Sequence, residues 1–201
     1  MRAHRIGKLR PMSKGRLEAF SDGVIAILIT IMVLELKVPH GAEWSSLKPM
    51  IPVLLSYLLS FVIVGIYWNN HHHLLHAAER ISGKILWANL HLLFWLSLFP
   101  FVTNWLGESH FATVPVAAYG VVMLLAGVGY KILQDILVAH HGAHSKLAAA
   151  IGSDTKGRAS AALYAVAVGA AFVNRWISCG IYVFVALMWL VPDKRIEKKL
   201  E

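Results

Sequence analysis

Ionisable and hydroxyl side chains lie inside one long apolar run, Arg16 to Leu36, near the start of the chain. Ser21 and Asp22 stand side by side in it, and Thr30 follows about two helical turns later. A charged group at the centre of a spanning helix costs about 3 kcal/mol even on lenient insertion scales. Such groups therefore indicate either contact with a permeating cation or hydrogen bonding between helices.

Helical geometry separates this run into different faces. With about 100° between successive residues, Asp22 lies roughly 140° away from Ile27. One stripe on the side of Ile27 contains Phe20, Gly23, Ile27, Thr30, Ile31 and Leu34. We expect Asp22 and its neighbours to hold the helix against other helices, and the stripe to face another subunit or a conduction path.

The composition is that of an integral membrane protein, because 57% of the 201 residues are hydrophobic and only 15% are charged. Soluble domains carry about 25% charged residues. Apolar segments predict one all-helical domain over 1–201, with six spans at about 16–36, 51–73, 84–105, 111–138, 157–172 and 176–191. The bilayer is the expected surrounding and the cell (inner) membrane the expected location.

Basic residues precede the first span and follow the last, so both termini are predicted to be cytoplasmic. These loop charges also account for the formal net charge of +8. We therefore expect no nucleic-acid partner.

Polar side chains recur at one depth in the first three predicted spans. They are Arg16, Ser21, Asp22, Trp68, His71 and Asn89, and Phe20 beside Ser21 is assigned to the same structural group. Polar groups in hydrocarbon need partners from the protein, so these residues predict one hydrogen-bonded network. Its expected role is helix packing rather than direct contact with a transported ion.

Four motifs resemble one known family. The run Arg16–Asp22 reads R-x-x-x-F-S-D, with Phe20 as its phenylalanine, and is similar to the signature of the transmembrane protein 175 family. Trp68–His71 resembles the family's W-x-x-H motif, Asn89 its third-helix asparagine, and Pro100–Thr103 its P-F-x-T ending. The four motifs are in register and cover roughly the first half of the chain.

The resemblance implies a potassium-preferring cation channel with passive flux, no cofactor and no enzymatic activity. Eukaryotic members carry two six-span repeats and dimerise, so a one-repeat chain is expected to form a homotetramer with its first helix lining the pore. By register with the family's constriction, the pore positions are Ile27, Thr30, Ile31 and Leu34. Rings of such apolar side chains close a pore by dewetting, and Thr30 supplies the one hydroxyl on this stripe.

Histidine clusters support an alternative function. They comprise His71, His72, His73 and His76 after the second span, and His140, His141 and His144 after the fourth. Pairs four residues apart, such as His72 and His76, are credible metal ligands, so a membrane-bound metalloenzyme or a metal transporter is the alternative. No carboxylate follows either cluster at ligand spacing, and we therefore expect solvated histidines and no metal site.

Two further patterns in the sequence suggest other kinds of transport protein. A proton-linked transporter would use Asp22 and Glu35 as titrating groups. Val128-Gly129-Tyr130 is similar to the carbonyl filter of ordinary potassium channels, but no threonine precedes it and Lys131 follows it. We assign no filter there.

Overall fold

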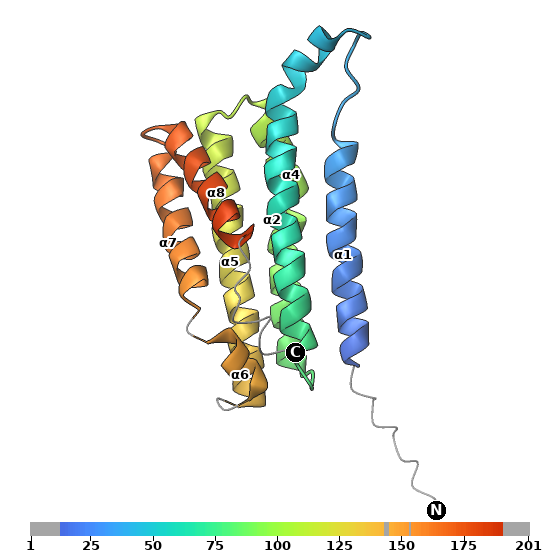
Figure 1. The fold of residues 1–201 in the computed structure, drawn as a ribbon, viewed down its shortest axis with the longest axis vertical. Coiled ribbons are helices and arrows are strands. Elements are labelled where there is room, and N and C mark those ends of the chain that lie inside the picture. The colour runs from blue at the N-terminus through green and yellow to red at the C-terminus, as the bar shows by residue number, and fades with distance from the viewer. Residues whose placement is uncertain (1–12, 143–144, 153, 191–201) are drawn as a thin grey trace, which may run out of the picture.

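The computed structural model describes residues 13–142, 145–152 and 154–190, and every regular element within them is a helix (Figure 1). The elements are α1 (Lys14–Leu34), the 3₁₀ helix η1 (Trp44–Met50), α2 (Ile51–His76), α3 (Gly83–Ser97), α4 (Phe99–Glu108), α5 (Thr113–His141), α6 (Lys146–Ile151), α7 (Thr155–Ala170) and α8 (Arg175–Leu190). The predicted all-helical class is confirmed. The basic terminal segments lie outside the described residues.

Within the described part of the chain, four helical stretches are long and apolar enough to cross a membrane. They are Lys14–Leu34, Trp44–His76, Gly83–Glu108 and Thr113–His141. The predicted fifth and sixth spans coincide with α7 and α8, but each has 16 residues. At 1.5 Å per residue each is about 24 Å long, which is shorter than a hydrocarbon core of about 30 Å. The fifth and sixth spans therefore stay a prediction.

The third span is interrupted, which the sequence pattern does not predict. α3 ends at Ser97 and α4 begins at Phe99, so the break at Leu98 lies two residues before Pro100. Proline has no backbone N–H, and its ring clashes with the carbonyl four residues earlier. Leu98 keeps right-handed helical dihedral angles, so α3 and α4 together form one helical stretch, Gly83–Glu108.

Two short helices are also unexpected, because they lie in segments predicted as polar connections. η1 extends the N-terminal end of α2, and α6 follows α5. The backbone N–H of Ala148 donates to the side chain of Ser145 at 3.1 Å, which caps α6.

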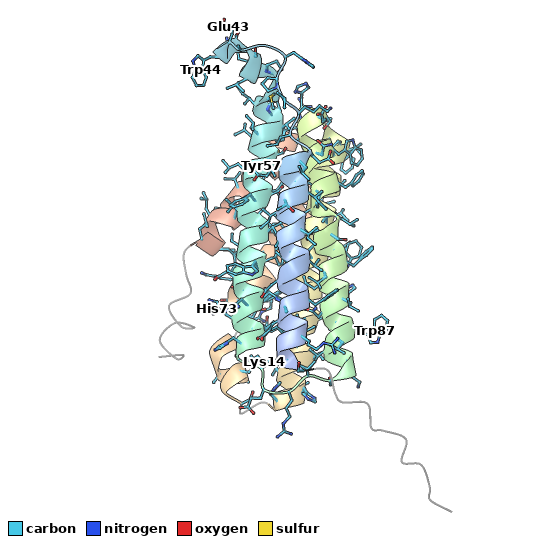
Figure 2. All side chains as sticks on the ribbon, turned by 90° about the vertical axis from the view of Figure 1, so that its right-hand side faces the viewer. Lys14, Glu43, Trp44, Tyr57, His73 and Trp87 are labelled. Carbon is cyan, nitrogen blue, oxygen red and sulfur yellow. The ribbon has the colours of Figure 1, made fainter. Side chains whose placement is uncertain are left out.

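The core is centred on α5, which packs against α3, α4, α7 and α8. α1 lies at the edge of the bundle and contacts α2, α3 and α4 (Figures 1 and 2). Some crossings are very close. A Cβ atom on the buried Gly107 of α4 would lie 2.6 Å from the Cα atom of Val53 on α2, so only glycine fits there.

Candidate pore helix and its polar clasps

One face of α1 is buried within its own subunit. The buried residues are Leu17, Ser21, Ile25, Leu28 and Met32. Their spacing of three or four residues places them on a single side of the helix. Because this side packs on α2, α3 and α4, it fixes the direction in which the opposite side faces (Figure 2).

The opposite face carries the apolar stripe and is left uncovered by the described part of the chain. Ile27 is 56% exposed, Ile31 38% and Leu34 80%. Thr30 is exposed between them, and its Oγ1 donates to the carbonyl of Ile27 at 2.8 Å. Since the hydroxyl proton is used within the helix, the lone pairs of this oxygen are free to accept a hydrogen bond or to contact a cation. The pore roles of these four residues stay a prediction.

Near its N-terminal end, α1 is held by buried hydrogen bonds that we call the N-terminal clasp (Ser21, Asp22, Trp68, His71 and Asn89). Asn89 Oδ1 lies 2.7 Å from His71 Nε2, and Asn89 Nδ2 donates to Ser21 Oγ at 2.9 Å. Ser21 in turn donates to the carbonyl of Leu17 at 2.9 Å. Every bond in this series runs in one direction if His71 carries its proton on Nε2.

The carboxylate of the clasp lies at its edge. Trp68 Nε1 donates to Asp22 Oδ1 at 3.1 Å, and Trp68 is 44% exposed, whereas Ser21 and Asn89 are fully buried. The structure therefore brings together five of the residues predicted for the polar network, from α1, α2 and α3.

The other two predicted members do not join these hydrogen bonds. Phe20 is 52% exposed, and Arg16 is exposed one turn before Phe20. Within the described residues, no side-chain hydrogen bond connects Arg16 to the N-terminal clasp. Both residues face away from the subunit, and their place in the network stays a prediction.

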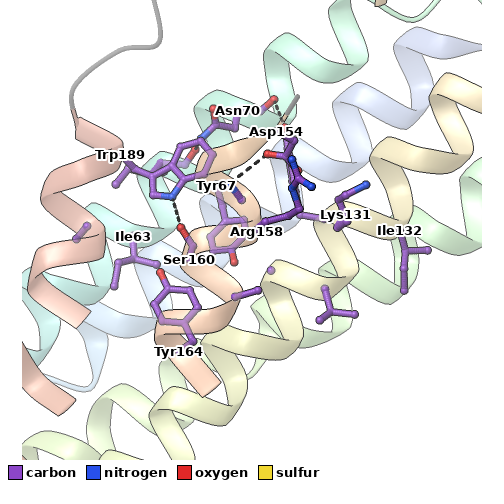
Figure 3. Close-up of a pocket in the computed structure, with 17 residues that line it drawn as sticks. Ile63, Tyr67, Asn70, Lys131, Ile132, Asp154, Arg158, Ser160, Tyr164 and Trp189 are labelled. Carbon is purple, nitrogen blue, oxygen red and sulfur yellow. Dashed lines mark hydrogen bonds between the residues drawn. The ribbon is translucent and has the colours of Figure 1, made fainter. Parts of the chain in front are cut away.

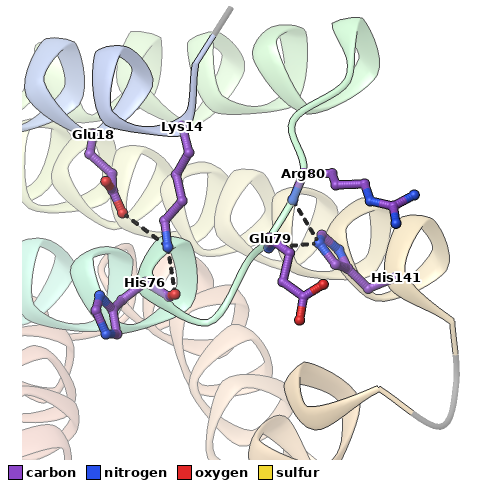
Figure 4. Close-up of polar contacts among 6 residues, drawn as sticks. All are labelled: Lys14, Glu18, His76, Glu79, Arg80 and His141. Atoms are coloured by element: carbon purple, nitrogen blue, oxygen red, sulfur yellow. Dashed lines mark hydrogen bonds and ion pairs between the residues drawn. The ribbon is translucent and has the colours of Figure 1, made fainter.

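A further contact fixes the first turn of α1. Lys14 Nζ donates to the carbonyl of His76 at 2.6 Å and lies 3.7 Å from the carboxylate of Glu18 (Figure 4). His76 ends α2, where carbonyls have no partner within the helix and the dipole favours a cation. The two helix ends are therefore held side by side.

A second group of hydrogen bonds, the C-terminal clasp (Ser60, Thr103 and Tyr119), is not predicted from the sequence. Thr103 Oγ1 donates to Ser60 Oγ at 2.7 Å, and Ser60 Oγ lies 2.9 Å from the hydroxyl of Tyr119. The three buried side chains connect α4, α2 and α5. The one feature of the sequence that could have indicated this clasp is Thr103, which ends the P-F-x-T motif.

At this level α1 itself offers the C-terminal clasp only the sulfur of Met32, 3.9 Å from Thr103 Oγ1, and the residues just after α1 make exposed polar contacts. Asn104 Nδ2 donates to Glu35 Oε2 at 3.2 Å, and Lys37 forms an ion pair with Glu108 at 2.9 Å. Asn104 Oδ1 is buried and has no hydrogen-bond partner among the described residues. The C-terminal end of α1 is therefore held by surface contacts.

The histidines do not form a metal centre in the described residues. The rings of His72 and His76 stack on the exposed side of α2 with centroids 6.1 Å apart. Within residues 13–142, 145–152 and 154–190, no three or more His, Cys, Asp or Glu side chains are arranged to hold a metal ion. His144 lies outside the described residues. The histidines that the structure describes give no support to the metalloenzyme alternative.

His141 instead connects two segments. Its Nε2 accepts hydrogen bonds from the backbone N–H groups of Glu79 and Arg80 at 2.9 and 3.2 Å (Figure 4). Its Nδ1 lies 2.9 Å from the carbonyl of Leu137, so the neutral ring with its proton on Nδ1 fits all three contacts. This arrangement closes the connection between α2 and α3 onto the end of α5.

The filter-like triplet Val128-Gly129-Tyr130 lies inside the continuous helix α5. Its carbonyls are therefore used by the helix, and a Cβ atom on the buried Gly129 would lie 3.2 Å from the Cα atom of Leu92. The close packing of α5 against α3 therefore explains why a glycine occupies this position.

Comparisons with known proteins find potassium channels and proteins of the TMEM175 family. The sequence model of the family described as "Endosomal/lysosomal potassium channel TMEM175" matches residues 16–100. A potassium channel of Chryseobacterium sp. (strain P1-3) is 55% identical over 190 residues, which cover 94% of this chain and 99% of that protein. A potassium channel of Chamaesiphon minutus is 32% identical over 189 residues, which cover 86% of this chain and 91% of that protein.

The fold has a counterpart among solved structures. The crystal structure of a lysosomal potassium-selective channel TMEM175 homolog from Chamaesiphon minutus superposes with a TM-score of 0.77 and 30% sequence identity. The superposition covers 89% of this chain and 96% of that chain. Three of the four sequence motifs lie within the segment 16–100 that the family model matches, and the fourth begins at its last residue, Pro100.

Proposed function

The chain belongs to the TMEM175 potassium-channel family, and from this premise we propose that it conducts potassium passively through a central pore lined by α1 of four identical subunits. A single helix cannot enclose an ion, so copies of α1 must face one another around an axis. Closed rotational symmetry gives such an arrangement without open ends. The function is transport, with potassium as the permeant ion and with no cofactor required.

The exposed apolar stripe of α1 is the observation that carries this proposal. The N-terminal clasp and the buried face hold the helix so that Ile27, Ile31 and Leu34 face outward from the subunit. Four copies of this stripe around an axis would form successive apolar rings. Such rings close a narrow pore by dewetting, because they offer an ion no replacement for its hydration shell.

Thr30 is the candidate for discrimination between cations. Its hydroxyl oxygen presents lone pairs on the stripe, since its proton is donated to Ile27. A ring of four such oxygens would supply partial negative charge where the neighbouring rings supply none. Arg16, Phe20 and the N-terminal clasp serve assembly and helix position in this proposal.

We assign six spans in a single domain, with both termini in the cytoplasm of the cell. Four stretches meet the length of a span outright, while α7 and α8 would cross a locally thinned bilayer. The basic ends of the sequence favour this orientation through the positive-inside rule.

The test is flux from liposomes that contain the purified protein, measured for potassium and for sodium. For wild type we expect passive potassium flux that exceeds sodium flux. Ile27→Asn, which places an amide in the proposed constriction, should raise the flux or reduce the preference for potassium by about fivefold or more, because a wetted ring no longer closes the pore.

Val33→Asn is the matched control, because Val33 is 44% exposed on α1 but lies about 120° from Ile27. It should leave flux and ion preference near wild type. A folded oligomer without flux in any of the three proteins would refute a channel, and equal effects of the two substitutions would refute an Ile27 constriction.

A further inference from the structure

A cavity of about 210 Å³ lies between α2, α5, α7 and α8, and α1 contributes no residue to its wall (Figure 3). Most of the wall is apolar, and includes Ile63, Gly127, Val128, Ile132, Ala161 and Ala186. Val128 and Ile132 are 39% and 38% exposed, so the cavity opens to the outside of the bundle. Water would find few hydrogen-bond partners there, whereas hydrocarbon suits this wall.

The polar side chains of the wall gather at one end. Asn70, Lys131, Asp154 and Arg158 lie at the rim, where α2 and α5 approach their C-termini and α7 begins (Figure 3). In the proposed orientation this end faces the cytoplasm. Along the membrane normal, the cavity therefore has a polar end towards the cytoplasm and an apolar part deeper in the membrane.

Among the described residues at this rim, basic side chains outnumber acidic ones. Lys131, Lys156 and Arg158 are the cations, and Lys156 Nζ lies 5.9 Å from the ring centroid of Trp189, which lines the cavity. Asp135 forms an ion pair with Lys131, and Asp154 accepts a hydrogen bond from the backbone N–H of Gly157 at 3.2 Å. Burial raises the pKa of the Asp154 carboxyl above its usual value. Three cations thus face two carboxylates.

Tyr164 provides an independent observation deeper in the wall. It is only 6% exposed, and its hydroxyl has no hydrogen-bond partner among the described residues. The other two tyrosines of the wall are bonded, Tyr67 to the carbonyl of Met123 and Tyr130 to that of Asn70. Because Tyr164 lines the cavity and its hydroxyl oxygen is not fully enclosed by the described residues, this group can donate to an occupant that carries an acceptor oxygen.

We propose that this cavity binds an anionic phospholipid of the cytoplasmic leaflet, with an acyl chain against the apolar wall and the phosphate beside Lys131 and Arg158. The hydroxyl of Tyr164 donates to an ester carbonyl. Six residues separate Arg158 from Tyr164, about 9 Å along α7, a distance that a glycerophosphate ester spans. Basic pockets between spanning helices on the cytoplasmic side are known to suit anionic headgroups.

The site shares a helix turn with the N-terminal clasp. Tyr67 and Asn70 line the cavity, while Trp68 and His71 on the same turns of α2 face the clasp. A bound lipid therefore supports the turn of α2 that holds α1. The inference rests on the proposed membrane orientation but not on conduction.

Native mass spectrometry of the full chain in detergent tests this site, with phosphatidylglycerol and phosphatidylcholine of identical acyl chains as probes. We expect wild type to retain phosphatidylglycerol at least tenfold better. The double variant Lys131→Gln/Arg158→Gln should lose this preference. Arg80→Gln/Lys84→Gln, which removes two exposed cations away from the cavity, should keep it.

A gain-of-binding variant keeps the test decisive if the double variant does not fold. Asp154→Asn removes a rim carboxylate, keeps an oxygen for Gly157, and tolerates the left-handed backbone at φ 36°. It should raise the preference for phosphatidylglycerol about threefold. Ala161→Phe, which narrows the cavity, should lower retention of both lipids while the oligomer elutes as in wild type.

Several outcomes would overturn the lipid site. These are equal retention of the two lipids by wild type, an unchanged preference in the double variant, or an equal loss in the Arg80/Lys84 control. Displacement of the lipid by equimolar oleate or by inorganic phosphate would also exclude a phospholipid. Potassium flux without lipid preference refutes the site alone, and lipid preference without flux refutes the proposed channel alone.

Discussion

The two ends of α1 are held in different ways. At the N-terminal end, Ser21 belongs to α1 itself and hydrogen-bonds within a fully buried cluster with Asn89 and His71. At the C-terminal end, the buried hydrogen bonds connect α2, α4 and α5 with one another, and α1 contributes only the sulfur of Met32, 3.9 Å from Thr103 Oγ1. The buried polar groups thus fix one end of the helix and leave the other to apolar packing and surface contacts.

Because of this difference, the polar contacts at the two ends should contribute unequally to the free energy of unfolding. A buried donor or acceptor that loses its partner costs the free energy of its desolvation, whereas an exposed one turns to water. Substitutions in the N-terminal clasp should therefore destabilise the fold most, and those of the exposed contacts least. Three substitutions test this order.

Asn89→Leu should have the largest effect. It removes both hydrogen bonds of the amide and leaves the Nε2 proton of His71 buried without a partner. We expect the free energy of unfolding to fall by about 3 kcal/mol, with loss of the proposed tetramer in detergent. Thermal unfolding followed by circular dichroism, together with size-exclusion chromatography, measures both effects.

Leu90→Ala is the control for that substitution, because Leu90 is the next residue of α3 and is 41% exposed. It should change the free energy of unfolding by less than about 1 kcal/mol. A change for Asn89→Leu no larger than this control would mean that the N-terminal clasp does not anchor α1.

Thr103→Val should have an intermediate effect. The side chain keeps its shape but loses the proton donated to Ser60, while Ser60 and Tyr119 still bond each other. We expect a loss of about 1 kcal/mol in the free energy of unfolding. The same thermal unfolding measures it, and a loss equal to that of Asn89→Leu would contradict the order of the two clasps.

The sequence predicted the N-terminal clasp but not the C-terminal one, and the reason lies in the residue types. Asp22, His71 and Asn89 are conspicuous in apolar spans, because each carries a group that hydrocarbon cannot satisfy. Ser60 is not conspicuous, since a serine can donate to its own helix. Its pairing with Tyr119 depends on how α2 is rotated against α5, and residue spacing within one helix contains no such information.

Some features of the fold were likewise predictable from the sequence, and others were not. The apolar segments of the sequence coincide with helices of the structure, whereas the crossing of a membrane by all six of them stays a prediction. The break at Leu98 was not predicted, because a proline near the end of a span can either kink or end the helix and the apolar pattern continues across it. The cavity beside Tyr164 was not predictable either, because four helices that are distant in the sequence enclose it.

Glu35→Gln should have the smallest effect of the three substitutions. Glu35 is exposed, and within the described residues its one side-chain contact is the hydrogen bond that Oε2 accepts from Asn104 Nδ2 at 3.2 Å. Glutamine keeps an acceptor oxygen, so only the charge is lost, and exposed charged contacts contribute less than about 1 kcal/mol. Thermal unfolding should therefore be near wild type. A loss as large as that of Thr103→Val would show that a surface contact holds the C-terminal end of α1 as firmly as buried hydrogen bonds do, and the contrast between the two ends would fail.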